Sequence, residues 1–321
     1  MNAGAVHRNF QSDAMRNYRL KHVDAFTIHP FAGNPAGVVL DARGLTDTEM
    51  QTIARENNLS ETAFILPSTV KSADLQIRWF TPTHEVPLCG HATIASFHSL
   101  AEEGMEGMST QGQHYFKLQT KSGILSVRVE KNFQGTTVEF QLPLPKFKVK
   151  KNLSSPLLHA LGLRKTDLES KLPVVVDSYL YIPVKSRKTL EKLTPDFALL
   201  LKSSRQEKVL GVCLFTLETY DTSSSVHSRF FAPAVGINED PVTGSSNGPL
   251  GMYLWQYVIA RDIPVRSRQL ADGKTEFIGE QGNEIGRAGH VKIRVVAIDG
   301  GVVGLSIAGE AVTIMNSILS F

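Results

Sequence analysis

The chain has 321 residues, 42% of them hydrophobic, which is enough apolar material for two cores. The formal net charge is +3, and the 34 Lys and Arg are spread along the chain, which argues against a nucleic-acid partner. The two cysteines, Cys89 and Cys213, occur in no CxxC or metal-ligand spacing, so neither a disulfide framework nor a zinc site is expected. No signal-like segment and no window of 18 apolar residues occurs, so we expect a cytoplasmic protein that makes no membrane contact.

The first 18 residues are polar and aperiodic, so we expect a flexible extension over residues 1–18. Beyond it, hydrophobic alternation and turn residues predict a first lobe over residues 19–142. Its expected elements are strands over 20–28, 36–40, 61–66, 73–80, 114–120, 123–130 and 135–142, and helices over 46–58 and 91–104. Thr46 and Glu49 form a capping box at the start of the first helix. The second helix is apolar around most of its circumference, which is typical of a helix enclosed by a sheet.

A proline-rich stretch over residues 142–152 marks a change of unit, so we expect a second lobe over residues 143–309. Within it, the pattern predicts strands over 180–184 and 211–217, one helix over 187–201, and further strands toward the C-terminus.

An internal repeat is the strongest organisational signal in the sequence. The stretch RWFTPTHEVPLCGHATIASFHSL from Arg78 follows the same plan as RFFAPAVGINEDPVTGSSNGPLGMYL from Arg229: a strand, a proline turn and a glycine that begins a helix. Gly90 corresponds to Gly244, and the second turn is three residues longer. Duplication of one α+β lobe explains this plan, and it predicts that the two helix N-termini face each other across a cleft between the lobes.

Paired helix N-termini favour an anionic ligand, because they present unpaired backbone N–H groups and partial positive charge. Neither GHATIA nor GSSNGP has the spacing of a dinucleotide or P-loop motif, so we expect a carboxylate ligand in preference to a nucleotide phosphate. The alternative is that Gly90 and Gly244 serve only turn and cap geometry.

Four polar side chains near these helix starts are candidates for chemistry. His91 lies in the first turn of its helix, where the helix dipole would keep the imidazole neutral, although a structural histidine is the commoner case. Asp240 could orient a partner or act only as an N-terminal cap. Ser245 could bind ligand or simply begin its helix. Glu61 precedes an apolar strand, where burial would raise its pKa for proton transfer, and the alternative is a solvated loop residue.

Five segments together resemble the phenazine-biosynthesis (PhzF-like) family, within the wider diaminopimelate-epimerase-like fold. They are VDAFTIHPFAGNPAGVV, ARENNLSETAFIL, FTPTHEVPLCGHATIA, RFFAPAVGINEDPVTGSSNGPLGMYL and EQGNEIGRAGHVKIRV. The resemblance runs from about Leu20 to the C-terminus. It implies an α+β fold of two pseudo-symmetric lobes, each a mixed β-sheet wrapped around a central apolar helix. It also implies that the last strand, within residues 310–321, returns to the first lobe.

The resemblance also implies which residues form the site between the lobes. The family's catalytic positions correspond here to Glu61, His91, Asp240 and Ser245, with the glutamate as the proton carrier. We expect the substrate to contact Gly90, Ala92, Gly244, Ser246 and Asn34. No metal or cofactor is expected, and the partners implied are a small anionic carboxylate substrate and a second copy of the chain in a homodimer.

One departure from the wider fold decides between reaction types. Its epimerases use two cysteines on opposite faces of the reacting carbon, but this chain has Cys89 at the first position and Thr243 at the second. A threonine hydroxyl is too weakly acidic to replace a thiol, so a proton shift within one substrate, an isomerisation, suits the chain better than inversion of a stereocentre.

Two other functions were weighed. A non-catalytic small-molecule-binding or scaffold protein could keep the same fold, although retention of the four catalytic positions argues against it. A thiol hydrolase could use Cys89 with His91. It is disfavoured because residues two apart at a helix start are expected to point in different directions.

Overall fold

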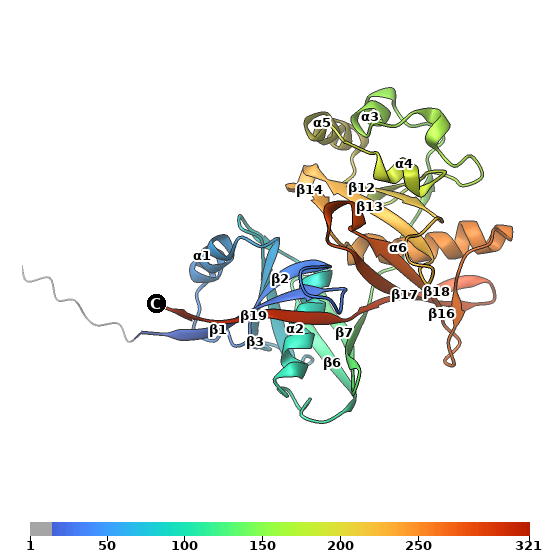
Figure 1. Ribbon diagram of the computed structural model, residues 1–321. Coiled ribbons are helices and arrows are strands. Elements are labelled where there is room, and N and C mark those ends of the chain that lie inside the picture. The colour runs from blue at the N-terminus through green and yellow to red at the C-terminus, as the bar shows by residue number, and fades with distance from the viewer. Residues whose placement is uncertain (1–14) are drawn as a thin grey trace, which may run out of the picture.

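The computed structural model describes residues 15–321, so residues 1–14 of the expected extension lie outside the described part of the chain. The prediction is wrong for Asn17 and Tyr18, which begin a β-strand paired with the end of the chain. Figure 1 shows that the chain forms two lobes, with the C-terminal segment running from one lobe back to the other. Among residues 15–321, no helix is both long enough and apolar enough to cross a lipid bilayer.

The first lobe is a mixed sheet wrapped around one buried helix. Its elements are β1 (Asn17–Ala25), β2 (Asn34–Val39), α1 (Asp47–Asn57), β3 (Glu61–Pro67), β4 (Leu75–Phe80), β5 (Glu85–Val86), α2 (Gly90–Glu102), β6 (Gly112–Thr120), β7 (Gly123–Asn132) and β8 (Gly135–Gln141). α1 begins with the predicted capping box of Thr46 and Glu49. α2 is the enclosed helix, in which Ile94, Phe97 and Leu100 are completely buried. Burying one side chain of the size of Phe97 contributes about 1.5–3 kcal/mol.

The second lobe repeats this architecture around a second central helix. Its elements are β9 (Lys148–Val149), α3 (Ser155–Ala160), β10 (Val175–Val176), β11 (Tyr179–Pro183), α4 (Arg187–Glu191), α5 (Phe197–Glu207), β12 (Gly211–Thr216), β13 (Val226–Ala232), β14 (Ile237–Asp240), α6 (Gly244–Tyr253), β15 (Arg268–Gln269), β16 (Thr275–Gln281), β17 (Gly289–Ile298) and β18 (Gly301–Gly309). The last strand is β19 (Ala311–Ser320). α6 is the central helix, and it continues as a π-helical turn over Leu254–Val258.

The prediction of one helix over residues 187–201 is wrong, because α4 and α5 are separate helices. Pro195 lies between them, and a proline disfavours helical geometry in the residue that precedes it. Asp196 then caps α5, since its carboxylate accepts the backbone N–H of Leu199 at 2.9 Å.

Strand pairing follows the same order in both lobes, which confirms the internal repeat. In the first lobe β2 runs parallel to β3, β3 antiparallel to β4, and β4 parallel to β6, while β6, β7 and β8 are successively antiparallel. In the second lobe β11, β12, β13, β16, β17 and β18 show the same sequence of parallel and antiparallel pairs. α2 and α6 therefore occupy equivalent places, each after a short hairpin strand.

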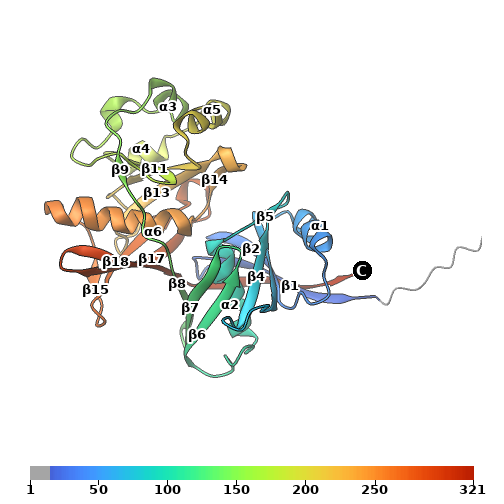
Figure 2. The same ribbon diagram turned by 180° about the vertical axis from the view of Figure 1, so that it is seen from behind.

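The outermost strand of the first lobe comes from the far end of the chain. β19 pairs antiparallel with β1 along its whole length, as β9 pairs with β10 in the second lobe. In addition, β8 pairs antiparallel with β18, so the two sheets are continuous across the seam between the lobes (Figure 2). The lobes are thus joined both by the crossing chain and by a shared strand pair.

The repeat also keeps an arginine–glutamate clamp that the sequence pattern alone did not reveal. Arg78 on β4 donates two hydrogen bonds to Glu85, at 2.8 and 2.7 Å. Arg229 on β13 does the same with Glu239, at 2.8 Å each. Each clamp fastens the hairpin that leads into a central helix, and so sets the position of that helix start.

Candidate active site

The N-termini of the two central helices meet between the lobes. A Cβ atom placed on Gly90 would lie 3.9 Å from the Cα of Gly244. The residues before them, Cys89 and Thr243, both have extended backbones and act as N-caps. The first N–H groups of a helix have no partner within it, so two partially positive ends converge at this place. At Gly244 the reason for glycine is close packing, since a Cβ there would lie 2.7 Å from Ile307.

Three polar side chains of the first lobe gather beside this junction. Glu61 is the first residue of β3, and its Oε2 lies 3.3 Å from Nε2 of His91. The Sγ of Cys89 lies 3.5 Å from Nδ1 of His91. The expectation that Cys89 and His91 point in different directions is therefore wrong. As an N-cap with extended φ and ψ, Cys89 folds its side chain back over the helix start, toward the N–H of Ala92.

Burial controls the protonation of all three groups. It raises the pKa of the Glu61 carboxyl, with hydrogen bonds from Ser60 and Cys89 opposing the shift. Burial lowers the pKa of His91, so the imidazole is neutral at pH 7, and desolvation is the main cause where the sequence suggested the helix dipole. The pKa of the Cys89 thiol is raised well above its usual value, so it stays protonated. Among the described residues, no hydrogen-bond partner satisfies Oε2 of Glu61.

Asp240, at the end of β14, brings a fourth titratable group from the second lobe. Its Oδ1 accepts a hydrogen bond from the Nδ2 of Asn34 at 2.8 Å, and its Oδ2 accepts one from the hydroxyl of Thr243 at 2.5 Å. Burial raises the pKa of Asp240 to about 6, while the neighbouring His91 and these hydrogen bonds oppose the rise. The N-cap of α6 is Thr243, so the simple capping role considered for Asp240 does not describe its position.

The other expected contacts divide into two groups. Ser245 is exposed, and its Oγ lies 3.0 Å from the hydroxyl of Tyr179. Asn34 and Ala92 are completely buried at the junction. The side chain of Ser246 is also completely buried, but it faces the interior of the second lobe, next to the Cys213 thiol. The structure therefore brings Glu61, His91, Asp240, Ser245, Gly90, Gly244, Ala92 and Asn34 together and leaves the Ser246 side chain outside the group.

Sequence reasoning missed three residues that support this site. The amide of Gln281 donates to the backbone carbonyl of Asp240 at 2.8 Å and to the Thr243 hydroxyl at 3.1 Å. Ser60 approaches Nε2 of His91 at 3.3 Å. Tyr179 bonds Ser245, as above. Gln281 and Ser60 lie within segments that carried the family resemblance, whereas nothing in the pattern around Tyr179 distinguished it from a strand residue.

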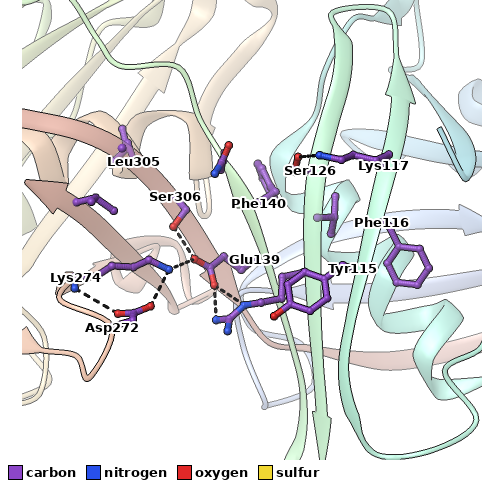
Figure 3. Close-up of a pocket in the computed structure, with 15 residues that line it drawn as sticks. Tyr115, Phe116, Lys117, Ser126, Glu139, Phe140, Asp272, Lys274, Leu305 and Ser306 are labelled. Atoms are coloured by element: carbon purple, nitrogen blue, oxygen red, sulfur yellow. Dashed lines mark hydrogen bonds and ion pairs between the residues drawn. The ribbon is translucent and has the colours of Figure 1, made fainter. Parts of the chain in front are cut away.

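The titratable side chains of the site are buried in this structure, since Glu61, His91 and Asp240 are each at most 8% exposed, whereas Ser245 beside them is exposed. The pocket of about 430 Å³ drawn in Figure 3 is a different place, on the seam beside β8 and β18. Its carboxylates Glu139 and Asp272 already pair with basic side chains, which indicates a structural role. Oxygen, sulfur and nitrogen atoms of Glu61, Cys89 and His91 lie within 4.8 Å of one another, close enough to reach one cation. That the site works without a metal or cofactor stays a prediction.

Comparison with known proteins agrees with this arrangement. The sequence profile of phenazine biosynthesis-like proteins, PhzC-PhzF, matches residues 23–317. The chain belongs to this family. An uncharacterized isomerase of Clostridium acetobutylicum is 40% identical over 315 residues, covering 94% of this chain and 98% of the relative. A second uncharacterized isomerase, from Bacillus subtilis, is 37% identical and covers 93% and 97%.

Solved structures show the PhzF fold directly. The crystal structure of a PhzF-family phenazine biosynthesis protein from Bacillus anthracis has 33% identity and a TM-score of 0.82, and covers 95% of this chain and 99% of that one. A probable proline racemase from Agrobacterium radiobacter, at 12% identity and a TM-score of 0.62, shares the fold alone. The α+β fold of two pseudo-symmetric lobes is thus established, and the names of the relatives support an isomerase activity.

Proposed function

We propose that this PhzF-family chain is an isomerase that moves a proton within one small carboxylate substrate, with Glu61 as the proton carrier. The observation that carries the proposal is the Glu61 carboxyl itself. It is buried beside the two converging helix starts, and its Oε2 has no hydrogen-bond partner among the described residues. A buried carboxyl with a raised pKa, whose Oε2 lies 3.3 Å from Nε2 of His91 without accepting a hydrogen bond from it, suits a group that takes a proton and gives it back.

Substrate binding follows from the helix starts. The carboxylate of the substrate would accept hydrogen bonds from the free N–H groups that begin α2 and α6, with the hydroxyl of Ser245 beside them. The ionised Glu61 would then remove a proton from a neighbouring carbon. The electron pair left behind shifts along the substrate, and the same carboxyl returns the proton at a second carbon, so no atom is gained or lost.

The groups around Glu61 favour return of the proton to the same face of the substrate from which Glu61 removed it. Neutral His91 can donate or accept a hydrogen bond without carrying charge into the site. The hydroxyl of Thr243 donates to Asp240 and so has no proton-abstracting role on the other face. With no second thiol, inversion by two cysteines has no structural basis at this site.

The test begins with a panel of aromatic and amino-acid-like carboxylates in heavy water, followed by proton NMR for isomerised or deuterated products. With a substrate in hand, Glu61→Gln keeps the shape of the side chain and removes its titration. We expect turnover to fall by at least about 100-fold, the low end for general acid–base catalysis, while binding survives. Glu56→Gln, on the exposed face of α1, is the matched control and should leave turnover unchanged.

Turnover of Glu61→Gln at the wild-type rate would mean that another group carries the proton. The competing function, a binding or scaffold protein, gives a different pattern. In that case carboxylates would raise the melting temperature of the wild type and of Glu61→Gln equally, with no product formed from any of them.

A further inference from the structure

A segment of the second lobe, residues 281–290, is hydrogen-bonded to a loop of the first lobe, residues 26–33, next to the site. Arg287 lies between β16 and β17, just after the 3₁₀ turn Asn283–Ile285. Its Nε donates to the carbonyl of Gly33 at 2.9 Å, and its Nη2 donates to the carbonyl of Ala32 at 2.9 Å. The same Nη2 forms an ion pair with Oδ1 of Asp24 at 2.6 Å. One guanidinium thus holds three acceptors of the opposite lobe.

Further hydrogen bonds, made by Asp24 and by the backbone, involve the rest of the loop between β1 and β2. Asp24 is completely buried, and its second oxygen accepts the N–H of Phe31 at 2.7 Å. Two backbone bonds run alongside, from the N–H of Gly33 to Ala288 at 3.0 Å and from the N–H of His290 to Phe26 at 2.8 Å. Residues 26–33 are therefore bound to the second lobe at several points around Arg287.

The backbone of this loop has a positive φ angle at three positions. Phe26 and Phe31 have φ angles of 63° and 66°, a conformation that non-glycine residues rarely adopt. Gly33 has φ of 60°, and a Cβ there would lie 2.2 Å from the carbonyl oxygen of Ala25. The Phe31 side chain is 71% exposed, so burial of its ring does not offset the unfavourable backbone. Burial of the Phe26 ring and the bond from the N–H of Phe31 to Asp24 offset part of this cost within the first lobe, and the bonds to the second lobe add to them.

Asp240 accepts hydrogen bonds from both sides of this contact, from Asn34 of the first lobe and from Gln281 of the second. The loop leads directly into Asn34, whose Nδ2 donates to Oδ1 of Asp240 and to the carbonyl of Val242, each at 2.8 Å. Because both partners are acceptors, the orientation of the Asn34 amide is fixed. On the second lobe, Gln281 is the first residue of the segment 281–290 and donates to the carbonyl of Asp240. The position of the loop and the position of the Asp240 carboxylate are therefore linked through Asn34.

We propose that Arg287 is a positioning residue that holds the loop 26–33 on the second lobe, and thereby keeps Asn34 against Asp240 and keeps Cys89 buried between the lobes. The proposal depends on where the site lies and not on the role given to Glu61. Loss of the Arg287 bonds exposes Cys89 to solvent, while strands β8 and β18 stay paired. There Arg294 bonds both Glu139 and Glu276, and Glu139 lines the pocket drawn in Figure 3.

The two cysteines of the chain provide the test, because one lies in the site and the other does not. Cys89 is buried between the lobes, and Cys213 is buried in the core of the second lobe. The protein is treated with N-ethylmaleimide, and labelling of each cysteine is timed by mass spectrometry of its peptide. In Arg287→Met we expect Cys89 to react at least tenfold faster than in the wild type, with Cys213 unchanged. Arg287→Lys, which keeps the charge but not the fork of donors, should fall between the two.

Arg294→Lys is the matched control, since it weakens an arginine ion pair on the other side of the same seam. It should leave the ratio of Cys89 to Cys213 labelling at the wild-type value. An unchanged Cys89 rate in Arg287→Met overturns the proposal, and so does an equal acceleration of both cysteines, which is the signature of general destabilisation. If Arg287→Met does not fold, Arg287→Lys is judged by the same ratio. None of these outcomes involves turnover, so they are independent of the test of Glu61.

Discussion

The two repeats keep the same scaffold but differ in the chemistry at their helix starts. In both, a strand arginine holds a glutamate of the following hairpin, and a glycine begins the central helix. In the first lobe the helix start is surrounded by Glu61, Cys89 and His91. In the second it is surrounded by hydroxyls and amides, and its titratable group is Asp240. Duplication preserved what positions the helices, while the residues that face the junction diverged.

The pair Cys89 and Thr243 shows this divergence most clearly. Both are N-caps at equivalent places, yet the Cys89 thiol lies among proton-transfer candidates and the Thr243 hydroxyl donates to a carboxylate. A hydroxyl that stabilises the ionised form of Asp240 contributes to binding geometry and not to proton abstraction. The symmetric fold therefore contains an asymmetric site, and each of the following experiments compares the two halves.

The largest difference is expected between the two arginine clamps. Arg229 is 6% exposed and also donates to the carbonyls of Leu190 and Leu193, so Arg229→Met leaves these two carbonyls and the Glu239 side chain, which is 11% exposed, without their donor. We expect it to lower the free energy of unfolding by about 4 kcal/mol. Arg78→Met should cost only about 1 kcal/mol, because Arg78 is more exposed than Arg229 and Lys121 still pairs with Glu85.

Urea unfolding of both variants measures this comparison. Equal losses for the two substitutions would contradict the idea that burial makes the second clamp the stronger scaffold. The double variant that combines Arg229→Met with Glu239→Gln serves as the control. It should recover part of the loss, because no unpaired charge then remains buried.

A smaller but pH-dependent effect is expected from Asp240. Its pKa is about 6 in the folded chain, against about 3.9 for an unperturbed aspartate. As pH rises from about 4 to 6, the folded state holds a proton that the unfolded state has lost, so Asp240 makes the protein progressively less stable. The penalty is complete by about pH 7, one unit above the folded pKa, and amounts to about 3 kcal/mol.

Asp240→Asn removes that penalty. Relative to the wild type, the variant should therefore gain about 2 kcal/mol in unfolding free energy between pH 4 and pH 7, whatever constant cost the substitution carries. Denaturant titrations at the two pH values give this difference. Asp47→Asn, an exposed carboxylate on α1, is the control and should show no such gain. A flat pH response for Asp240→Asn would mean that this carboxyl is not desolvated as described.

Much of the fold was predictable because its signals are local. Alternating strands, the capping box at Thr46 and the repeated glycines at the two helix starts can all be seen within short windows of sequence. The break between α4 and α5 has a local signal too, Pro195 followed by the cap Asp196, but the apolar periodicity across it predicts one helix. Short strands such as β5 and β14 were missed, because two to four residues give no pattern without their partners.

The site was predictable in its residues but not in its geometry. The resemblance indicated Glu61, His91 and Asp240, but no pattern showed that Asn34 reaches Asp240 across 206 positions of sequence. The direction of the Cys89 side chain depends on its backbone being extended at the N-cap, which sequence spacing does not reveal. Contacts of this kind arise from packing between lobes, and they are determined by the whole chain.

The smallest expected effect belongs to Cys89, and it is the one that separates the two chemistries of the site. Its Sγ lies beside His91 as a thiol nucleophile's would, so the geometric objection to thiol hydrolysis no longer holds. The remaining objection is electrostatic: burial and the Glu61 carboxyl raise the pKa of the thiol, and a thiol is a far weaker nucleophile than a thiolate. With a substrate identified, Cys89→Ala should keep turnover within roughly tenfold, about 1.4 kcal/mol of barrier. Cys213→Ala is the control for loss of a buried thiol elsewhere. Complete loss of turnover in a folded Cys89→Ala protein, with Cys213→Ala active, would transfer the catalytic role from the glutamate to the thiol.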